Sequence, residues 1–161
     1  MHNKVKSEMY SKSVVAVVIA LCAISPSAAS SQTVKSTWDG VYTDAQAARG
    51  SSKYAQCAMC HGASLEGNGE APPLVGRFIP DWAGTTLADL FDKIQTTMPL
   101  YAPGTLSAGD TTDLIAFLLK SNNFPAGANE LAPSVDVLKT VSFDVVKPAP
   151  NAKGAGTKPR K

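Results

Sequence analysis

Cys57-Ala58-Met59-Cys60-His61 is the segment of this 161-residue chain that decides its fold. Two cysteines with two residues between them, followed at once by a histidine, form the attachment pattern of a c-type haem. This spacing lets one helical turn present both sulfurs to the two vinyl-bearing edges of a porphyrin, and it delivers the adjacent histidine to the iron. We therefore expect Cys57 and Cys60 to form thioethers with one haem and His61 to bind its iron.

The two cysteines of this motif also admit other interpretations. In an oxidising compartment they could form a disulfide. A structural zinc site needs four protein ligands, and after residue 29 the chain has no cysteine or histidine beyond Cys57, Cys60 and His61. A thioredoxin-like redox pair would follow a strand in a βαβ unit, and no such pattern is visible. Haem attachment is favoured over zinc and thioredoxin chemistry, and the disulfide stays open.

The first 29 residues have the pattern of a secretory signal peptide. Three lysines precede the apolar run of residues 14–24, and Ser27 and Ala29 are the small residues expected before a cleavage site. The run has eleven residues, fewer than the roughly 18 needed to span a bilayer. Cys22 suggests a lipid anchor, but the preceding Leu21 is larger than that signal accepts. We predict a periplasmic protein without stable membrane insertion.

The remaining chain divides into a short leader, one folded unit and a tail. We interpret residues 30–42, rich in Ser and Thr, as an extended leader, and residues 43–144 as the folded unit with a C-terminal extension. Residues 145–161 are rich in proline and glycine, carry five basic and no acidic residues, and are expected to be disordered. This basic tail is either a solvated end or a segment that steers the acidic body toward an acidic partner.

Three helices are predicted within residues 43–144. Capping residues and apolar residues at helical spacing place them from Thr43 to the cysteines, from Thr86 to the residue before Pro99, and from Ser107 to about Asn122. No segment alternates with the period of a strand. Three short helices make a marginal core by themselves, so a large apolar cofactor would complete it. The expected fold class is all-α, with three or more short helices wrapped around one covalent haem.

Met98 is the candidate for the second axial position on the iron. Met59 lies between the two cysteines and cannot reach the other side of the ring, whereas Met98 follows the second predicted helix, 37 residues after His61. A thioether opposite an imidazole favours ferrous iron and raises the reduction potential. A packing role for Met98 is the alternative.

Several further motifs between residues 42 and 133 are shared with a known family. They are Ala48-Arg49-Gly50, Tyr54, Ala71-Pro72-Pro73-Leu74, Leu90-Phe91, Thr96-Thr97-Met98-Pro99, Pro103-Gly104-Thr105-Leu106-Ser107, Leu114-Ile115-Ala116-Phe117 and Asn123-Phe124-Pro125-Ala126-Gly127. On these motifs and the cysteine motif, the chain resembles the class I c-type cytochromes. It is most similar to the small periplasmic cytochromes associated with quinoprotein (pyrroloquinoline quinone) dehydrogenases.

The resemblance implies roles for residues outside the cysteine motif. The carbonyl of Pro72 would accept a hydrogen bond from His61 Nδ1 and so orient the ring. Leu74 would pack on the haem. Arg77 and Trp82 would meet the haem propionates, one as a cation and the other as an indole N–H donor. For Arg77 and Trp82 the alternatives are an ordinary surface charge and a core aromatic.

The resemblance also implies a function. We expect a monomeric mono-haem electron carrier rather than an enzyme, with a periplasmic dehydrogenase as donor and an oxidase or another cytochrome as acceptor. Nucleic acid is not an expected partner. One alternative is a haem subunit bound tightly to a dehydrogenase complex. The other is a haem sensor with an open distal site, in which Met98 does not bind the iron.

Overall fold

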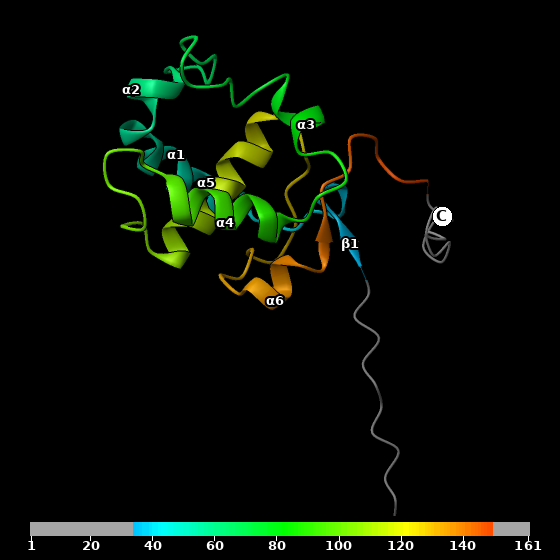
Figure 1. Cartoon of the computed structure of the whole chain (residues 1–161). Coiled ribbons are helices and arrows are strands. Elements are labelled where there is room, and N and C mark those ends of the chain that lie inside the picture. The colour runs from blue at the N-terminus through cyan, green and yellow to red at the C-terminus, as the bar shows by residue number, and fades with distance from the viewer. Residues whose placement is uncertain (1–33, 150–161) are drawn as a thin grey trace, which may run out of the picture. The chain divides into compact units, whose positions relative to one another are not determined.

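The computed structural model describes residues 34–149, and the expected all-α fold is confirmed (Figure 1). The predicted signal peptide, the first residues of the predicted leader and most of the predicted tail lie outside the described residues. The helices are α1 (Asp44–Lys53), α2 (Ala58–His61), α3 (Phe78–Asp81), α4 (Leu87–Thr97), α5 (Ala108–Ser121) and α6 (Val135–Leu138), with 3₁₀ turns η1 (Thr37–Asp39) and η2 (Tyr54–Gln56). Within residues 34–149, no helix is long and apolar enough to cross a membrane.

The three long helices begin where their capping residues predict. The side chain of Thr43 accepts a hydrogen bond from the Gln46 backbone N–H (3.1 Å) at the start of α1. Thr86 forms a capping box with Asp89 before α4, and the Ser107 hydroxyl caps α5. Such caps satisfy backbone N–H groups that have no partner within the helix. The first predicted helix is broken, because α1 passes into η2 and the motif cysteines frame a separate short helix, α2.

Helices α1 and α5 cross in close contact at Gly50. A Cβ atom built on Gly50 would lie 1.9 Å from the Asp113 carbonyl oxygen and 2.9 Å from the Phe117 Cβ. Only a residue without a side chain therefore fits at this crossing. One turn further along, the Tyr54 and Phe117 rings pack with their centroids 5.2 Å apart.

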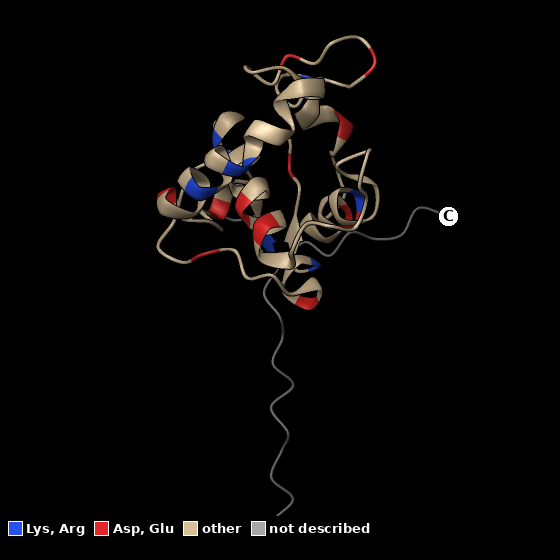
Figure 2. Cartoon of the chain, turned by 90° about the vertical axis from the view of Figure 1, so that its left-hand side faces the viewer, with Lys and Arg blue, Asp and Glu red and all other residues tan. Residues whose placement is uncertain are grey.

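A network of charged side chains reinforces the same crossing. Arg49 contacts Asp113 on α5 (3.0 Å) and Glu130 (2.9 Å), and Lys53 contacts Asp113 (2.8 Å) and Asp110. Figure 2 shows basic and acidic positions close together on these helices. Burial alone would raise the pKa of Asp113, but the hydrogen bonds from Arg49 and Lys53 outweigh burial and hold its pKa below the usual range.

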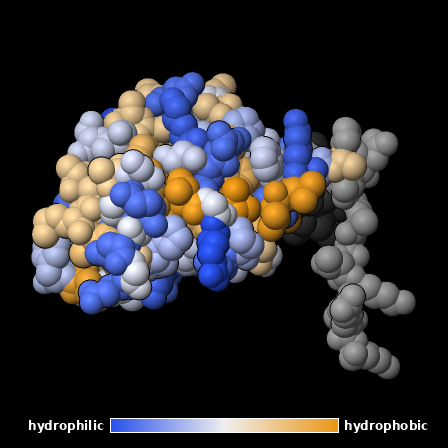
Figure 3. Space-filling model, turned by 90° about the horizontal axis from the view of Figure 1, so that it is seen from above, coloured by the Kyte–Doolittle hydropathy of each residue, from blue (hydrophilic) through white to orange (hydrophobic). Residues whose placement is uncertain are grey.

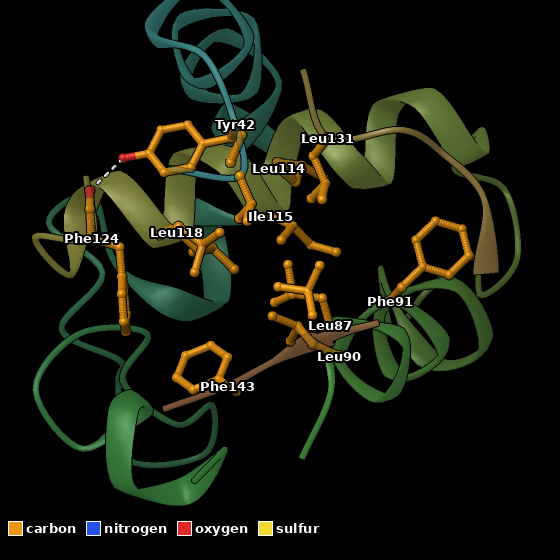
Figure 4. Close-up of a cluster of buried hydrophobic side chains, with 14 of the residues drawn as sticks. Tyr42, Leu87, Leu90, Phe91, Leu114, Ile115, Leu118, Phe124, Leu131 and Phe143 are labelled. Atoms are coloured by element: carbon orange, nitrogen blue, oxygen red, sulfur yellow. Dashed lines mark hydrogen bonds between the residues drawn. The ribbon is translucent and has the colours of Figure 1, made fainter. Parts of the chain in front are cut away.

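The apolar core lies between α4, α5 and the C-terminal extension, residues 122–144, which follows α5 (Figure 4). Leu87 and Leu90 of α4 meet Leu114, Ile115 and Leu118 of α5, and all five side chains are buried. The extension adds Phe124, Leu131, Leu138 and Phe143, which are also buried. The Phe143 ring lies edge-on to the rings of Phe124 and Phe78, with ring centroids 5.4 and 5.8 Å away. The extension is therefore part of the core.

The folded unit starts earlier than predicted, because most of the predicted leader packs onto the extension. Strand β1 (Lys35–Ser36) pairs in parallel with β2 (Val141–Ser142). Thr37 and Tyr42 are buried, and the Tyr42 hydroxyl donates to the Phe124 carbonyl oxygen (2.6 Å). In the described part of this segment, Ser36 caps η1, and both Ser36 and Thr37 are buried. The predicted boundary at residue 43 is corrected to about residue 35.

Candidate haem-binding site

A cavity of about 330 Å³ lies between α2, α3, α4, α5 and the loop that joins α2 to α3. This volume falls in the range of about 300–1,000 Å³ typical of ligand pockets. Of the predicted site residues, the structure brings together seven in its lining: Cys57, Cys60, His61, Pro72, Leu74, Trp82 and Met98. Most of the other lining side chains are apolar, among them Phe78, Leu90, Ile94, Leu106, Leu114 and Leu118. Such a cavity suits a large apolar group that binds through a few polar atoms.

The two cysteines are presented by one helical turn. The backbone N–H groups of Cys60 and His61 both donate to the Cys57 carbonyl oxygen, at 3.1 and 2.9 Å. No disulfide joins the two sulfurs, so both are available for thioether formation. Cys60 is exposed and Cys57 is half-buried. Burial raises the pKa of the Cys57 thiol, and the neighbouring Cys60 adds to the shift, so the thiol is neutral at physiological pH.

The His61 ring is held in one orientation. It is 8% exposed, and its Nδ1 lies 2.8 Å from the Pro72 carbonyl oxygen. Because a carbonyl oxygen can only accept, Nδ1 carries a proton, which in a neutral imidazole leaves a free lone pair on Nε2. This is the arrangement by which a hydrogen bond to the second ring nitrogen fixes a metal-binding histidine. The protein alone therefore fixes the orientation of the His61 ring.

The loop between α2 and α3 is folded tightly around His61. The Gly67 backbone N–H donates to the His61 carbonyl oxygen (2.8 Å), and the Leu74 N–H donates to the Leu65 carbonyl oxygen (2.8 Å). Gly67 has φ of +74°, and a Cβ there would lie 2.6 Å from the Ala71 carbonyl oxygen. Only glycine fits this turn without strain. The loop consists of successive turns and leads into the short helix α3.

Tyr54 holds the backbone that follows His61. Its hydroxyl donates to the Gly62 carbonyl oxygen (2.7 Å), which directly follows His61 in the chain. Burial, with smaller contributions from Cys57 and Glu66, raises the pKa of Tyr54 to about 12. The phenol is therefore a hydrogen-bond donor at every physiological pH.

Met98 lines the cavity from a different element. It is half-buried and forms the C-terminal cap of α4, where its backbone N–H donates to the Ile94 carbonyl oxygen (2.9 Å). Leu90, Ile94 and Met98 follow one another at four-residue spacing, which puts them on one side of the helix. An imidazole from α2 and a thioether from the end of α4 thus line the same cavity.

The two residues expected to meet the propionates are placed differently. Trp82 lines the cavity, with its ring centroid 6.3 Å from that of Phe78. Arg77 does not line it: its side chain is 82% exposed and lies 3.9 Å from the Asp81 carboxylate. The sequence analysis missed Lys93, which does line the cavity. Its position three residues after Leu90 on α4 could have revealed it.

The donor set fits iron held in a macrocycle. Among residues 34–149, no group of three or more His, Cys, Asp or Glu side chains could hold a bare metal ion. A haem brings four ring nitrogens of its own, so that one imidazole and one thioether complete six-coordinate iron. Two thiols on one turn and a histidine beside them in an apolar lining would hold a haem c, and Met98 lines the same cavity.

Comparison with known proteins agrees with this geometry. Residues 45–118 match the family model of cytochrome c oxidase, cbb3-type, subunit III. No curated protein and no solved structure was found to match the chain. The matched residues run from α1 into α5 and include both cysteines, His61 and Met98. Together, the cavity and this match confirm the predicted cofactor, one covalently bound haem c, and support a c-type cytochrome domain over the matched residues.

Proposed function

We propose that this protein is an exported carrier that moves one electron at a time between periplasmic redox proteins, with His61 and Met98 as the two axial ligands. The observation that carries the proposal is that both side chains line one cavity from separate elements. When both axial positions are filled by protein, no substrate can bind the iron. The bound haem supplies a one-electron iron couple, and the chain's residues hold and tune it.

The residues of the cavity have distinct tasks in such a carrier. The hydrogen bond from His61 Nδ1 to Pro72 keeps the imidazole in one tautomer and one orientation. The Met98 thioether, a soft ligand, favours the ferrous state. With haem bound, the mostly apolar lining would limit the access of water to the iron, which also favours the less charged ferrous state. We expect a positive midpoint potential as the joint result.

The expected partners are a quinoprotein dehydrogenase as electron donor and an oxidase or another cytochrome as acceptor. The dehydrogenase rests on the sequence resemblance alone. The oxidase gains support from the matched family, whose name refers to an oxidase subunit. A tightly bound subunit is the second candidate, and it is favoured by Leu100 and Tyr101, which line the cavity and are 77% and 70% exposed. Size-exclusion chromatography of the native protein separates a free monomer from a complex.

One experiment tests the carrier function directly. Reduced protein is mixed with membranes of the native host, and its reoxidation is followed by absorbance, while a second sample is exposed to carbon monoxide. A carrier is reoxidised at a rate proportional to its concentration, and its ferrous spectrum does not change with carbon monoxide. Rapid carbon monoxide binding without reoxidation by membranes would instead identify a haem sensor.

Periplasmic export is tested separately. The signal peptide predicted for residues 1–29 implies that the mature chain begins at Ser30. Cell fractionation followed by intact-mass analysis should find this mature chain, with one haem added, in the periplasmic fraction. Recovery of the unprocessed chain in the cytoplasm would contradict the proposal.

A further inference from the structure

Lys93 is the one Lys or Arg side chain among the described residues that line the haem cavity. Two carboxylates, Glu70 and Asp81, line the same cavity. Arg77, the cation expected from the sequence, lies outside the lining and near Asp81. The cavity therefore has two acidic side chains and a single permanent cation in its lining.

Lys93 lies on the side of α4 that faces the cavity. Leu90, three residues earlier, and Ile94, the next residue, also line the cavity. The Lys93 side chain is exposed, so its aliphatic stem can lie along the apolar wall while its ammonium group stays at the mouth. Within residues 34–149, no carboxylate forms an ion pair with it.

Haem c has two propionate carboxylates, and these need a counter-charge. Inside the cavity they would add two negative charges to a lining that already contains Glu70 and Asp81. Like charges at an apolar site repel one another, whereas an ammonium group stabilises a carboxylate through a charge-assisted hydrogen bond. We propose that the Lys93 ammonium binds a haem propionate. This inference rests on haem attachment and does not depend on which redox partners the protein has.

The pairing of Lys93 with a propionate would also change the midpoint potential of the haem iron. Reduction adds one negative charge to the haem, so a cation in the cavity wall favours the ferrous form and raises the midpoint potential. A carboxylate in the wall has the opposite effect. Lys93 would then offset part of the contribution from Glu70 and Asp81, both of which lower the potential.

The test compares K93Q and K93R with K139Q as a matched control. Lys139 is also an exposed lysine, but it follows α6 and lies outside the cavity lining. Two properties of each purified holoprotein are measured: the propionate bending band in the resonance Raman spectrum and the midpoint potential. We expect K93Q to shift the band and lower the potential, K93R to keep both near the wild-type values, and K139Q to change neither.

An unshifted propionate band in K93Q would overturn the proposal, even with a lowered potential, because a distant charge can change the potential without touching the propionate. A second measurement uses the unmodified holoprotein and so does not depend on any variant folding. Lysine acetylation is followed residue by residue by mass spectrometry, and Lys93 should react several-fold more slowly than Lys139. Equal rates would contradict the pairing. Neither measurement involves a redox partner, so failure of the carrier proposal would leave both results unchanged.

Discussion

The two walls of the haem cavity are built in different ways. The histidine wall comprises residues 54–74. Its His61 ring is hydrogen-bonded to Pro72, and the carbonyl oxygens of His61 and Gly62 accept hydrogen bonds from Gly67 and Tyr54. On the methionine wall, which comprises residues 98–101, Met98 is joined to α4 by one backbone hydrogen bond, and the next residues include the exposed Leu100 and Tyr101.

This difference has a consequence for stability. The protein chain alone orients the His61 ring, whereas under the proposed ligation the Met98 side chain would gain much of its restraint from the bond to iron. Segments with few buried contacts and few hydrogen bonds open at low free-energy cost. We therefore expect the methionine wall to open first under stress. Figure 3 looks onto the face that carries α2 and α3, where hydrophilic and hydrophobic residues lie side by side.

Loss of both thioethers should have the largest effect. Without haem, the difference between the histidine wall and the methionine wall can no longer be measured. In the double variant C57S/C60S we expect no haem to remain after denaturation, and a poorly folded chain, because the cavity between α4 and α5 would lack its filling. Haem staining of a denaturing gel and far-ultraviolet circular dichroism measure the two effects. M59L is the matched control, since it changes only the exposed residue between the cysteines. A compact, haem-free double variant would show that the core does not need the porphyrin.

Replacing Met98 should alter the methionine wall and leave the histidine wall intact. The substitution Met98→Leu keeps the side-chain volume but removes the thioether, so we expect a lower midpoint potential and binding of carbon monoxide by the ferrous protein. The far-red absorption band of ferric iron bonded to a thioether should disappear, while the helical content is retained. A wild-type spectrum in this variant would mean that Met98 has only a packing role.

A substitution at the α1–α5 crossing tests the support of the histidine wall. Tyr54, whose hydroxyl donates to the Gly62 carbonyl oxygen in that wall, lies one turn after Gly50. The substitution Gly50→Ala places a methyl group 1.9 Å from the Asp113 carbonyl oxygen. We expect a loss of about 1–3 kcal/mol in the free energy of unfolding, measured by denaturant titration. Gly109→Ala on α5 is the control, because its new Cβ would meet only the Ser107 Oγ at 3.9 Å. Equal stabilities for the two variants would show that the helices can separate without cost.

The charged network at the crossing should give the smallest effect, and it depends on pH. The pKa of Asp113 is lowered in the folded state, so its contribution to stability is present above its unfolded pKa of about 3.9 and is lost as the pH falls through the folded value. We expect Asp113→Asn to cost on the order of 1 kcal/mol near pH 7, because Arg49 and Lys53 are partly exposed.

The pH profile of unfolding checks this expectation. The difference between wild type and Asp113→Asn should shrink as the pH is lowered below 4. Asp136→Asn, an exposed carboxylate on α6 outside the network, serves as the control. A difference that stays constant from pH 7 to pH 3 would show that the effect of the substitution comes from packing and not from charge.

The sequence predicted those parts of the molecule that have strong local signals. The cysteine motif, the capping residues Thr43, Thr86 and Ser107, and the helical spacing of apolar residues were enough for the cofactor and the three long helices. Each of these signals acts within about one helical turn and needs no knowledge of distant contacts. The His61–Pro72 contact was expected only from the resemblance, and the structure has these two atoms 2.8 Å apart.

The features that the sequence did not predict depend on contacts between distant segments. Strands β1 and β2 have two residues each and are more than 100 positions apart, so neither shows a pattern of its own. The Arg77 side chain is exposed and does not line the cavity. It follows Gly76, whose φ of +66° no sequence pattern revealed. Lys93 was overlooked because charge on a helix suggests a solvent-facing side, although its spacing from Leu90 places it on the cavity side.

The most direct test of the difference between the two walls is a denaturant titration of the ferric wild-type protein with two signals recorded together. The far-red band reports the Met98–iron bond, and circular dichroism at 222 nm reports the helices. We predict that the band is present in the native protein and is lost at a lower guanidinium concentration than the helical signal, because the methionine wall opens before the fold does. Absence of the band from the native protein would contradict methionine ligation, and coincident loss of both signals would contradict the separate stability of the two walls.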